Sequence, residues 1–169
     1  YGPPVVVFHH SFGNPGWLPF HEALSGHAAV AAPDLPGFGR STQPPWARHP
    51  RDLALLMSWW LRATHPGPVT LVGCGFGGWV AAELATISPE LLAGLVLVAP
   101  AGLLPTDGQI LDQVLVSHSA YVQAAFEDPR AYEAVYGTEL TDDLLLAWDG
   151  NREMTARVAW KPYMYNRRL

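Results

Sequence analysis

Short runs rich in β-branched residues alternate with helical patterns over the first hundred residues of this chain. Four runs are expected to form strands: residues 4–9 (PVVVFH), 27–32 (HAAVAA), 68–72 (PVTLV) and 95–98 (LVLV). Alternation of this kind is typical of a parallel sheet whose strands are joined by crossover helices. The sequence therefore predicts an α/β fold built on a parallel sheet.

The stretches between these runs carry helical signals. Helices are expected at residues 17–24, 50–64 and 77–88, the last of them ended by Pro89. In the second, apolar side chains recur at the spacing of one helix face, namely Leu53, Leu56, Met57, Trp60 and Leu61. This spacing predicts an amphipathic helix.

The strand signal disappears after Pro100. Residues 110–160 are expected to form several helices, broken at Pro129, Gly137 and Gly150. We therefore expect two regions, an α/β core over residues 1–104 and a helical cap over residues 105–169. Four aromatic residues of the cap could either pack it on the core or line an apolar pocket beneath it: Trp148, Trp160, Tyr163 and Tyr165.

Charge and cysteine content exclude several classes of function. The net charge is −5 and Lys161 is the only lysine, so the chain lacks the basic stripe that nucleic-acid binding requires. Cys74 is the only cysteine, and the histidines have no CxxC partner typical of a zinc site, so we expect no metal or cofactor. The apolar run at residues 91–100 is about half of the roughly 20 residues that a membrane span needs. We expect a cytoplasmic protein with a small-molecule ligand, and its oligomeric state stays open.

The most informative segment joins the third expected strand to the third expected helix, in residues 71–85 (LVGCGFGGWVAAELA). Ligands of a parallel sheet bind at the carboxyl ends of its strands, and the glycines here permit a tight turn with residue 75 at its tip. Another strand end offers His9 and His10, which either bind substrate or are hydrogen-bonded at the sheet edge. Asp34, after the second strand, is expected to brace the turn that follows it.

Four stretches within the first 102 residues resemble the α/β-hydrolase family: VVVFHHSFG, APDLPGFGRS, LVGCGFGGWVAAE and LAGLVLVAPAG. The resemblance implies strand order second, first, third, fourth, helices on both faces of the sheet, and a helical cap. It also implies hydrolysis of an ester or similar carbonyl compound with an apolar body. The closing strands of that fold, and with them the triad's acid and histidine, are expected beyond the end of this chain.

The sequence departs from the family at the nucleophile. Where the family has Gly-x-Ser-x-Gly, this chain has GCGFG, so Gly75 stands at the position where serine is expected. Glycine has no side chain with which to attack a carbonyl, and Cys74 is expected to point away from the tip of the turn. The sequence as written therefore predicts no nucleophile-dependent turnover.

The oxyanion hole needs only backbone N–H groups, so it can persist without the nucleophile. The resemblance assigns one donor to the N–H of Phe76 and the other to the N–H of Ser11 or Phe12. The family often has His-Gly in the loop where this chain has His9 followed by His10. We expect an anion, a water or a ligand carbonyl oxygen to bind between the two donors.

Several interpretations of the turn stay open. Gly75 could be an engineered replacement of serine, a natural loss in a non-catalytic ligand-binding or interaction protein, or a variant whose chemistry uses other groups. Gly73, Gly75 and Gly78 also fit the G-x-G-x-x-G pattern of dinucleotide-binding sites. That pattern needs an acidic residue about 20 positions on, and residues 91–102 contain none, so this alternative is less favoured. His118 and Glu83 are expected to be packing or surface residues.

Overall fold

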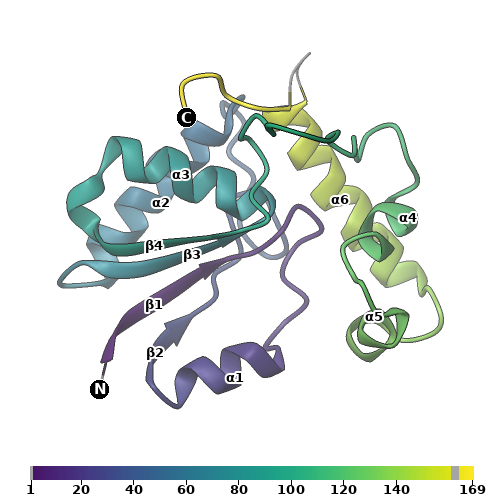
Figure 1. Ribbon diagram of the computed structural model, residues 1–169, viewed down its shortest axis with the longest axis horizontal. Coiled ribbons are helices and arrows are strands. Elements are labelled where there is room, and N and C mark those ends of the chain that lie inside the picture. The colour runs from purple at the N-terminus through teal and green to yellow at the C-terminus, as the bar shows by residue number, and fades with distance from the viewer. Residues whose placement is uncertain (1, 161–163) are drawn as a thin grey trace.

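A computed structural model describes residues 2–160 and 164–169. Its centre is one parallel sheet in the order β2-β1-β3-β4 (Figure 1). The strands are β1 (Gly2–Phe8), β2 (Ala28–Ala31), β3 (Val69–Cys74) and β4 (Leu92–Val98). The predicted fold class and strand order are confirmed. Strand β4 begins earlier than expected, because Leu92 already pairs with Val69.

Helices cover both faces of the sheet because the strand residues are apolar on both sides. α2 (Pro50–Thr64) and α3 (Phe76–Ile87) lie together on one face, and α1 (Pro19–Ser25) lies beside β2 on the other (Figure 1). Val6 and Phe8 of β1 belong to the large core under α2 and α3. Val5 and Val7 alternate with them and pack in a smaller cluster near α1.

The region expected to form the cap, called the cap below, contains α4 (His118–Gln123), α5 (Pro129–Tyr136) and α6 (Asp142–Ala159). Figure 1 shows these helices gathered beyond the end of the sheet where β3 and β4 finish. The hydroxyl of Thr141 accepts a hydrogen bond from the Leu144 N–H and begins α6. Met154 and Val158 of α6 are fully buried in the large core, so this helix joins the cap to the sheet.

Two expectations for the cap are wrong. Residues 99–117 form no helix, so the helical region begins at His118 rather than near residue 110. Gly150 does not break the chain but lies within α6. A glycine in a helix costs only about 1 kcal/mol relative to alanine. The burial of Trp148 and Met154 on either side of Gly150 outweighs that cost.

Candidate functional site

Gly75 adopts a backbone conformation that favours glycine. It lies between β3 and α3 with φ 52° and ψ −115°, a region that residues with a side chain rarely adopt. Its N–H donates to the Val98 carbonyl at 3.0 Å, and its carbonyl accepts from the Ala101 N–H at 2.8 Å. The end of β4 and the segment after it therefore bind both the N–H and the carbonyl of Gly75.

Close packing around this turn explains the other glycines of the segment. A Cβ atom on Gly73 would lie 2.6 Å from the Gly78 Cα, and one on Gly78 would lie 2.7 Å from the Pro100 Cβ. The Gly77 N–H also donates to the His9 carbonyl at 3.0 Å. Contact between strand and helix thus accounts for the glycine spacing without a bound nucleotide.

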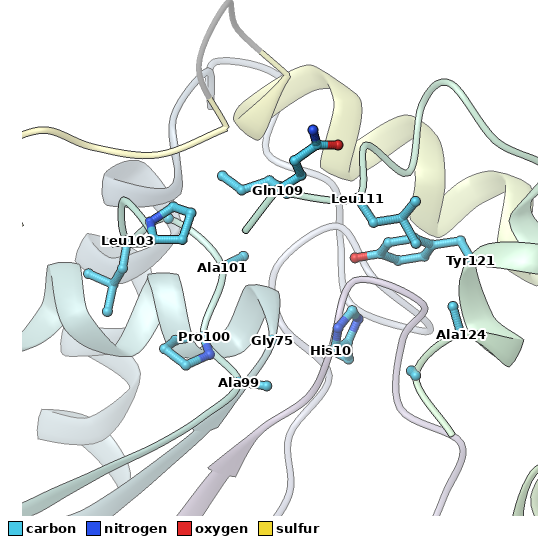
Figure 2. Close-up of a pocket in the computed structure, with 14 residues that line it drawn as sticks. His10, Gly75, Ala99, Pro100, Ala101, Leu103, Gln109, Leu111, Tyr121 and Ala124 are labelled. Atoms are coloured by element: carbon cyan, nitrogen blue, oxygen red, sulfur yellow. The ribbon is translucent and has the colours of Figure 1, made fainter. Parts of the chain in front are cut away.

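The His10 ring lies where a side chain on residue 75 would be. A Cβ atom on Gly75 would lie 1.9 Å from His10 Cδ2 and 2.2 Å from His10 Nε2. Figure 2 shows the ring beside Gly75, with the Tyr121 hydroxyl directed into the cavity that these residues line. The ring also stacks on Phe12, with centroids 4.2 Å apart and an interplanar angle of 16°. The space that glycine leaves at the turn is therefore filled by imidazole.

The protonation state of His10 follows from its surroundings. Burial, with smaller contributions from the neighbouring His9 and His118, lowers the pKa of His10 to about 4, so the ring is neutral at pH 7. Nδ1 accepts a hydrogen bond from the Ser11 N–H at 2.8 Å. Since a neutral imidazole carries one proton and Nδ1 is an acceptor, the proton is on Nε2. This nitrogen is a hydrogen-bond donor that faces the turn.

His9 is engaged differently. Its Nε2 accepts from the Leu35 N–H at 2.9 Å, and its Nδ1 donates to the His10 carbonyl at 2.7 Å. Burial also lowers the pKa of His9, so this ring is neutral. Both ring nitrogens thus bind backbone groups and connect the loop after β1 to the loop after β2.

The expected oxyanion donors differ in their hydrogen bonds. The Phe76 N–H begins α3, where no helical acceptor is available, and it has no acceptor elsewhere among the described residues. The Phe12 N–H also has no acceptor in the described part of the chain. The Ser11 N–H, by contrast, is occupied by His10 Nδ1. Of the two alternatives for the second donor, Phe12 is the one with an unoccupied N–H.

Two cavities meet at the turn, and both are lined by His10, Gly75 and Ala99. One, of about 320 Å³, extends along residues 100–111 to Tyr121. The other, of about 470 Å³, extends to α1 and α5 and is largely apolar. No arginine, lysine, aspartate or glutamate is among the described residues that line them. The site therefore suits an uncharged ligand.

Several other candidates from the sequence lie outside the reactive position. Cys74 packs with the apolar cluster near α1, and burial raises the pKa of its thiol, so it is a poor nucleophile. Asp34 braces the following turn as expected, because its carboxylate accepts from the Arg40 N–H at 3.1 Å. His118 is buried and packs against Trp148, with centroids 5.4 Å apart.

Glu83, Trp148, Trp160 and Tyr165 lie outside the two cavities. Trp148 is buried within the cap, whereas Trp160 is 52% exposed, and neither lines the two cavities. Tyr165 forms a bridge with Gly102, and Tyr163 lies outside the described residues. Glu83 is fully buried and accepts hydrogen bonds from three side chains: Arg51 Nη1 at 2.9 Å, Trp79 Nε1 at 3.2 Å and Asn166 Nδ2 at 2.7 Å.

Sequence reasoning missed two residues that shape the site. Tyr121 lines the smaller cavity; burial raises the pKa of its hydroxyl, although a hydrogen bond with Ser11 opposes this. Asn151 of α6 donates to the Phe12 carbonyl at 2.9 Å and so fixes the loop that carries His10. Both lie more than a hundred residues from that loop in the sequence, and no local pattern marks them.

Within the described ranges, no group of three or more His, Cys, Asp or Glu residues is placed to hold a metal ion. The helices described in residues 2–160 and 164–169 include none with the length and apolar character needed to cross a bilayer.

Comparison with known proteins supports the structural assignment. The chain is 42% identical over 93 residues to lipase LipV of Mycobacterium tuberculosis, a match covering 52% of this chain and 34% of that protein. It is 36% identical over 151 residues to a poly(3-hydroxyalkanoate) depolymerase of Ectopseudomonas oleovorans, covering 85% and 52%. A solved serine hydrolase involved in carbazole degradation has the same fold, with a TM-score of 0.63 at 22% identity and coverage of 90% and 62%.

These matches span about a third to a half of the two curated relatives. The sequence model of the alpha/beta hydrolase fold family matches residues 4–169, which is nearly the whole chain. The chain therefore belongs to the α/β-hydrolase fold family.

Proposed function

We propose that this chain binds an ester or related carbonyl compound with an apolar body at Gly75, and that it does not hydrolyse this ligand through residue 75. One observation carries the proposal: the Phe76 N–H has no acceptor among the described residues and directly follows Gly75, which lines both cavities. The relatives named as a lipase and a depolymerase agree with a ligand of this class.

The start of α3 favours an electron-rich oxygen. The first N–H groups of a helix have no partner within it, and the helix dipole adds a partial positive charge at that end. A carbonyl oxygen placed there would accept from Phe76 and, on the other side, from Phe12. Each such hydrogen bond contributes about 0.5–1.5 kcal/mol to binding. The apolar cavity of about 470 Å³ would hold the body of the ligand.

The nucleophile that the α/β-hydrolase family uses for catalysis is missing at residue 75. Gly75 has no reactive group, and the thiol of Cys74 is kept protonated by burial. His10 cannot serve as the base in its present form, because its Nδ1 accepts from Ser11 and its Nε2 carries the proton. The division into a core over residues 1–104 and a cap over residues 105–169 is part of the same proposal, since ligand would bind between them.

Calorimetric titration with acetophenone tests the proposal, because this ketone has a carbonyl group, an apolar body and no hydrolysable bond. Ethylbenzene, which lacks the oxygen, is the matched control ligand. We expect acetophenone to bind more tightly than ethylbenzene. We also expect no labelling by a fluorophosphonate probe and no hydrolysis of p-nitrophenyl butyrate. Equal affinity for the two ligands would refute carbonyl recognition, and labelling at the turn would refute the lack of a nucleophile.

The alternative on the same fold is hydrolysis, which the family match favours. If residue 75 were serine in the natural protein, this chain would be a disabled form of an esterase. In that case the His10 ring would have to move, because a Cβ atom on residue 75 would lie 2.2 Å from His10 Nε2 in its present position.

A further inference from the structure

We propose that the His10 imidazole takes the place of the nucleophile side chain, so that His10 and Gly75 form a matched pair and His10 Nε2–H binds the ligand's carbonyl oxygen. This inference rests on the proposed function, since it names the side chain that would recognise the same ligand. It also makes a separate claim about residues 10 and 75, which can be tested without any ligand.

The His10 ring fills the space of a side chain at residue 75. A Cβ atom there would lie 1.9 Å from His10 Cδ2 and 2.2 Å from His10 Nε2, and non-bonded atoms do not approach so closely. A serine at residue 75 and the observed His10 ring therefore exclude each other. Gly75 is the residue that lets the ring occupy the tip of the turn.

Neighbouring groups hold the His10 ring in this orientation. Stacking on Phe12 fixes the plane of the ring, and the hydrogen bond from the Ser11 N–H to Nδ1 fixes which edge faces the turn. Tyr121 packs on the ring from the cap, with centroids 5.7 Å apart. A side chain held on these sides directs one donor into the site at little further entropic cost.

The donors and the uncharged lining determine which chemical class of ligand fits. Nε2–H is a neutral donor, and the Phe76 N–H of the same turn is a second donor without an acceptor among the described residues. No cationic side chain of the described chain lines either cavity, so a carboxylate would lose its hydration without gaining an ion pair. The site therefore favours an uncharged ketone, ester or lactone over a carboxylic acid.

Ligand affinity tests the role of Nε2–H. Acetophenone, ethylbenzene and benzoate are titrated into the wild-type chain and into the variant His10→Phe, which keeps an aromatic ring but has no donor. We expect wild type to prefer acetophenone to both other ligands, and His10→Phe to lose about 2- to 10-fold of its affinity for acetophenone while binding ethylbenzene unchanged. His118→Phe is the control, because the ring nitrogens of His118 have no partner among the described residues.

Thermal unfolding tests the matched pair independently. The variants are Gly75→Ser, His10→Gly and the double variant, and the cycle cancels the backbone strain that serine suffers in either background. We expect the double variant to melt on the order of 3–10 °C above the value that adding the two single changes would give. If Gly75→Ser alone does not fold, recovery of a folded protein in the double variant is the same result.

The outcomes separate the two proposals. Additive melting temperatures would overturn the matched pair. Unchanged acetophenone affinity in His10→Phe would overturn the donor role of His10 while leaving carbonyl binding through the backbone intact. If wild type does not distinguish acetophenone from ethylbenzene, the proposed function and the donor role both fail, and the unfolding cycle still decides whether the ring occupies the nucleophile's place.

Discussion

Replacing Gly75 with alanine should destabilise this protein through two separate effects. At φ 52° a residue with a Cβ atom suffers backbone strain of about 1–2 kcal/mol. The new Cβ atom would also meet His10 Cδ2 at 1.9 Å, and overpacking of this kind costs about 1–3 kcal/mol. The free energy of unfolding should therefore fall by about 2–5 kcal/mol.

Two further glycines separate these effects. Gly137 has φ 80° but no atom within 4 Å of a Cβ position, so Gly137→Ala introduces backbone strain without a collision. Gly67 also has open space and is not in the left-handed region, so Gly67→Ala should change stability little. Urea denaturation of the three variants gives the comparison. The reasoning is refuted if Gly75→Ala lowers the free energy of unfolding by no more than the backbone strain of about 1–2 kcal/mol, because His10 would then not occupy the position described.

Three other predictions concern stability. Arg51→Ala should cost about 2 kcal/mol in urea denaturation, because it removes a charged partner from the fully buried Glu83, and equal stability would show that this bond contributes nothing. Gly150→Ala should raise the melting temperature by about 2–4 °C, since the residue lies in α6 with open space around it; a decrease would mean that the helix requires glycine there. Stability should also depend on pH through His10. Its folded pKa of about 4 is below the usual histidine pKa of 6.5, so between these values the unfolded chain binds the proton and the native protein does not. Protonation of His10 therefore leaves the free energy of unfolding unchanged above about pH 6.5. It lowers that free energy by about 3 kcal/mol as the pH falls to 4. Urea denaturation from pH 7 to pH 4 should consequently show a shallower loss in His10→Phe than in wild type, and parallel curves would contradict the assignment.

The sheet could be predicted from the sequence because its signals are local. Each strand is a short apolar run bounded by turn residues, and the crossover helices lie between them. The cap was harder to predict, because its helix boundaries depend on packing as well as on local signals. Gly150 looks like a break in isolation, yet the buried residues around it keep α6 continuous. The signal for a helix beginning near residue 110 was likewise too weak to locate the true beginning at His118.

The candidate site also combines features that the sequence predicts with features that arise only on folding. The turn at Gly75 could be predicted because the glycines and the flanking strand and helix are contiguous in the sequence. The position of His10 could not, because it depends on packing between the loop after β1 and a turn more than sixty residues away. Tyr121 and Asn151 reach that loop from the cap, so their roles also arise only in the folded chain.

The central claim is that the turn at Gly75 binds a carbonyl oxygen through donors that the fold leaves unoccupied. Amide ¹H–¹⁵N NMR spectra recorded during titration with acetophenone, and in parallel with ethylbenzene, test it most directly. We predict saturable downfield shifts of the Phe76 and Phe12 amide protons with acetophenone, which ethylbenzene does not produce. Shifts confined to residues of the apolar cavity, equal for both ligands, would contradict the claim and leave only an apolar binding pocket.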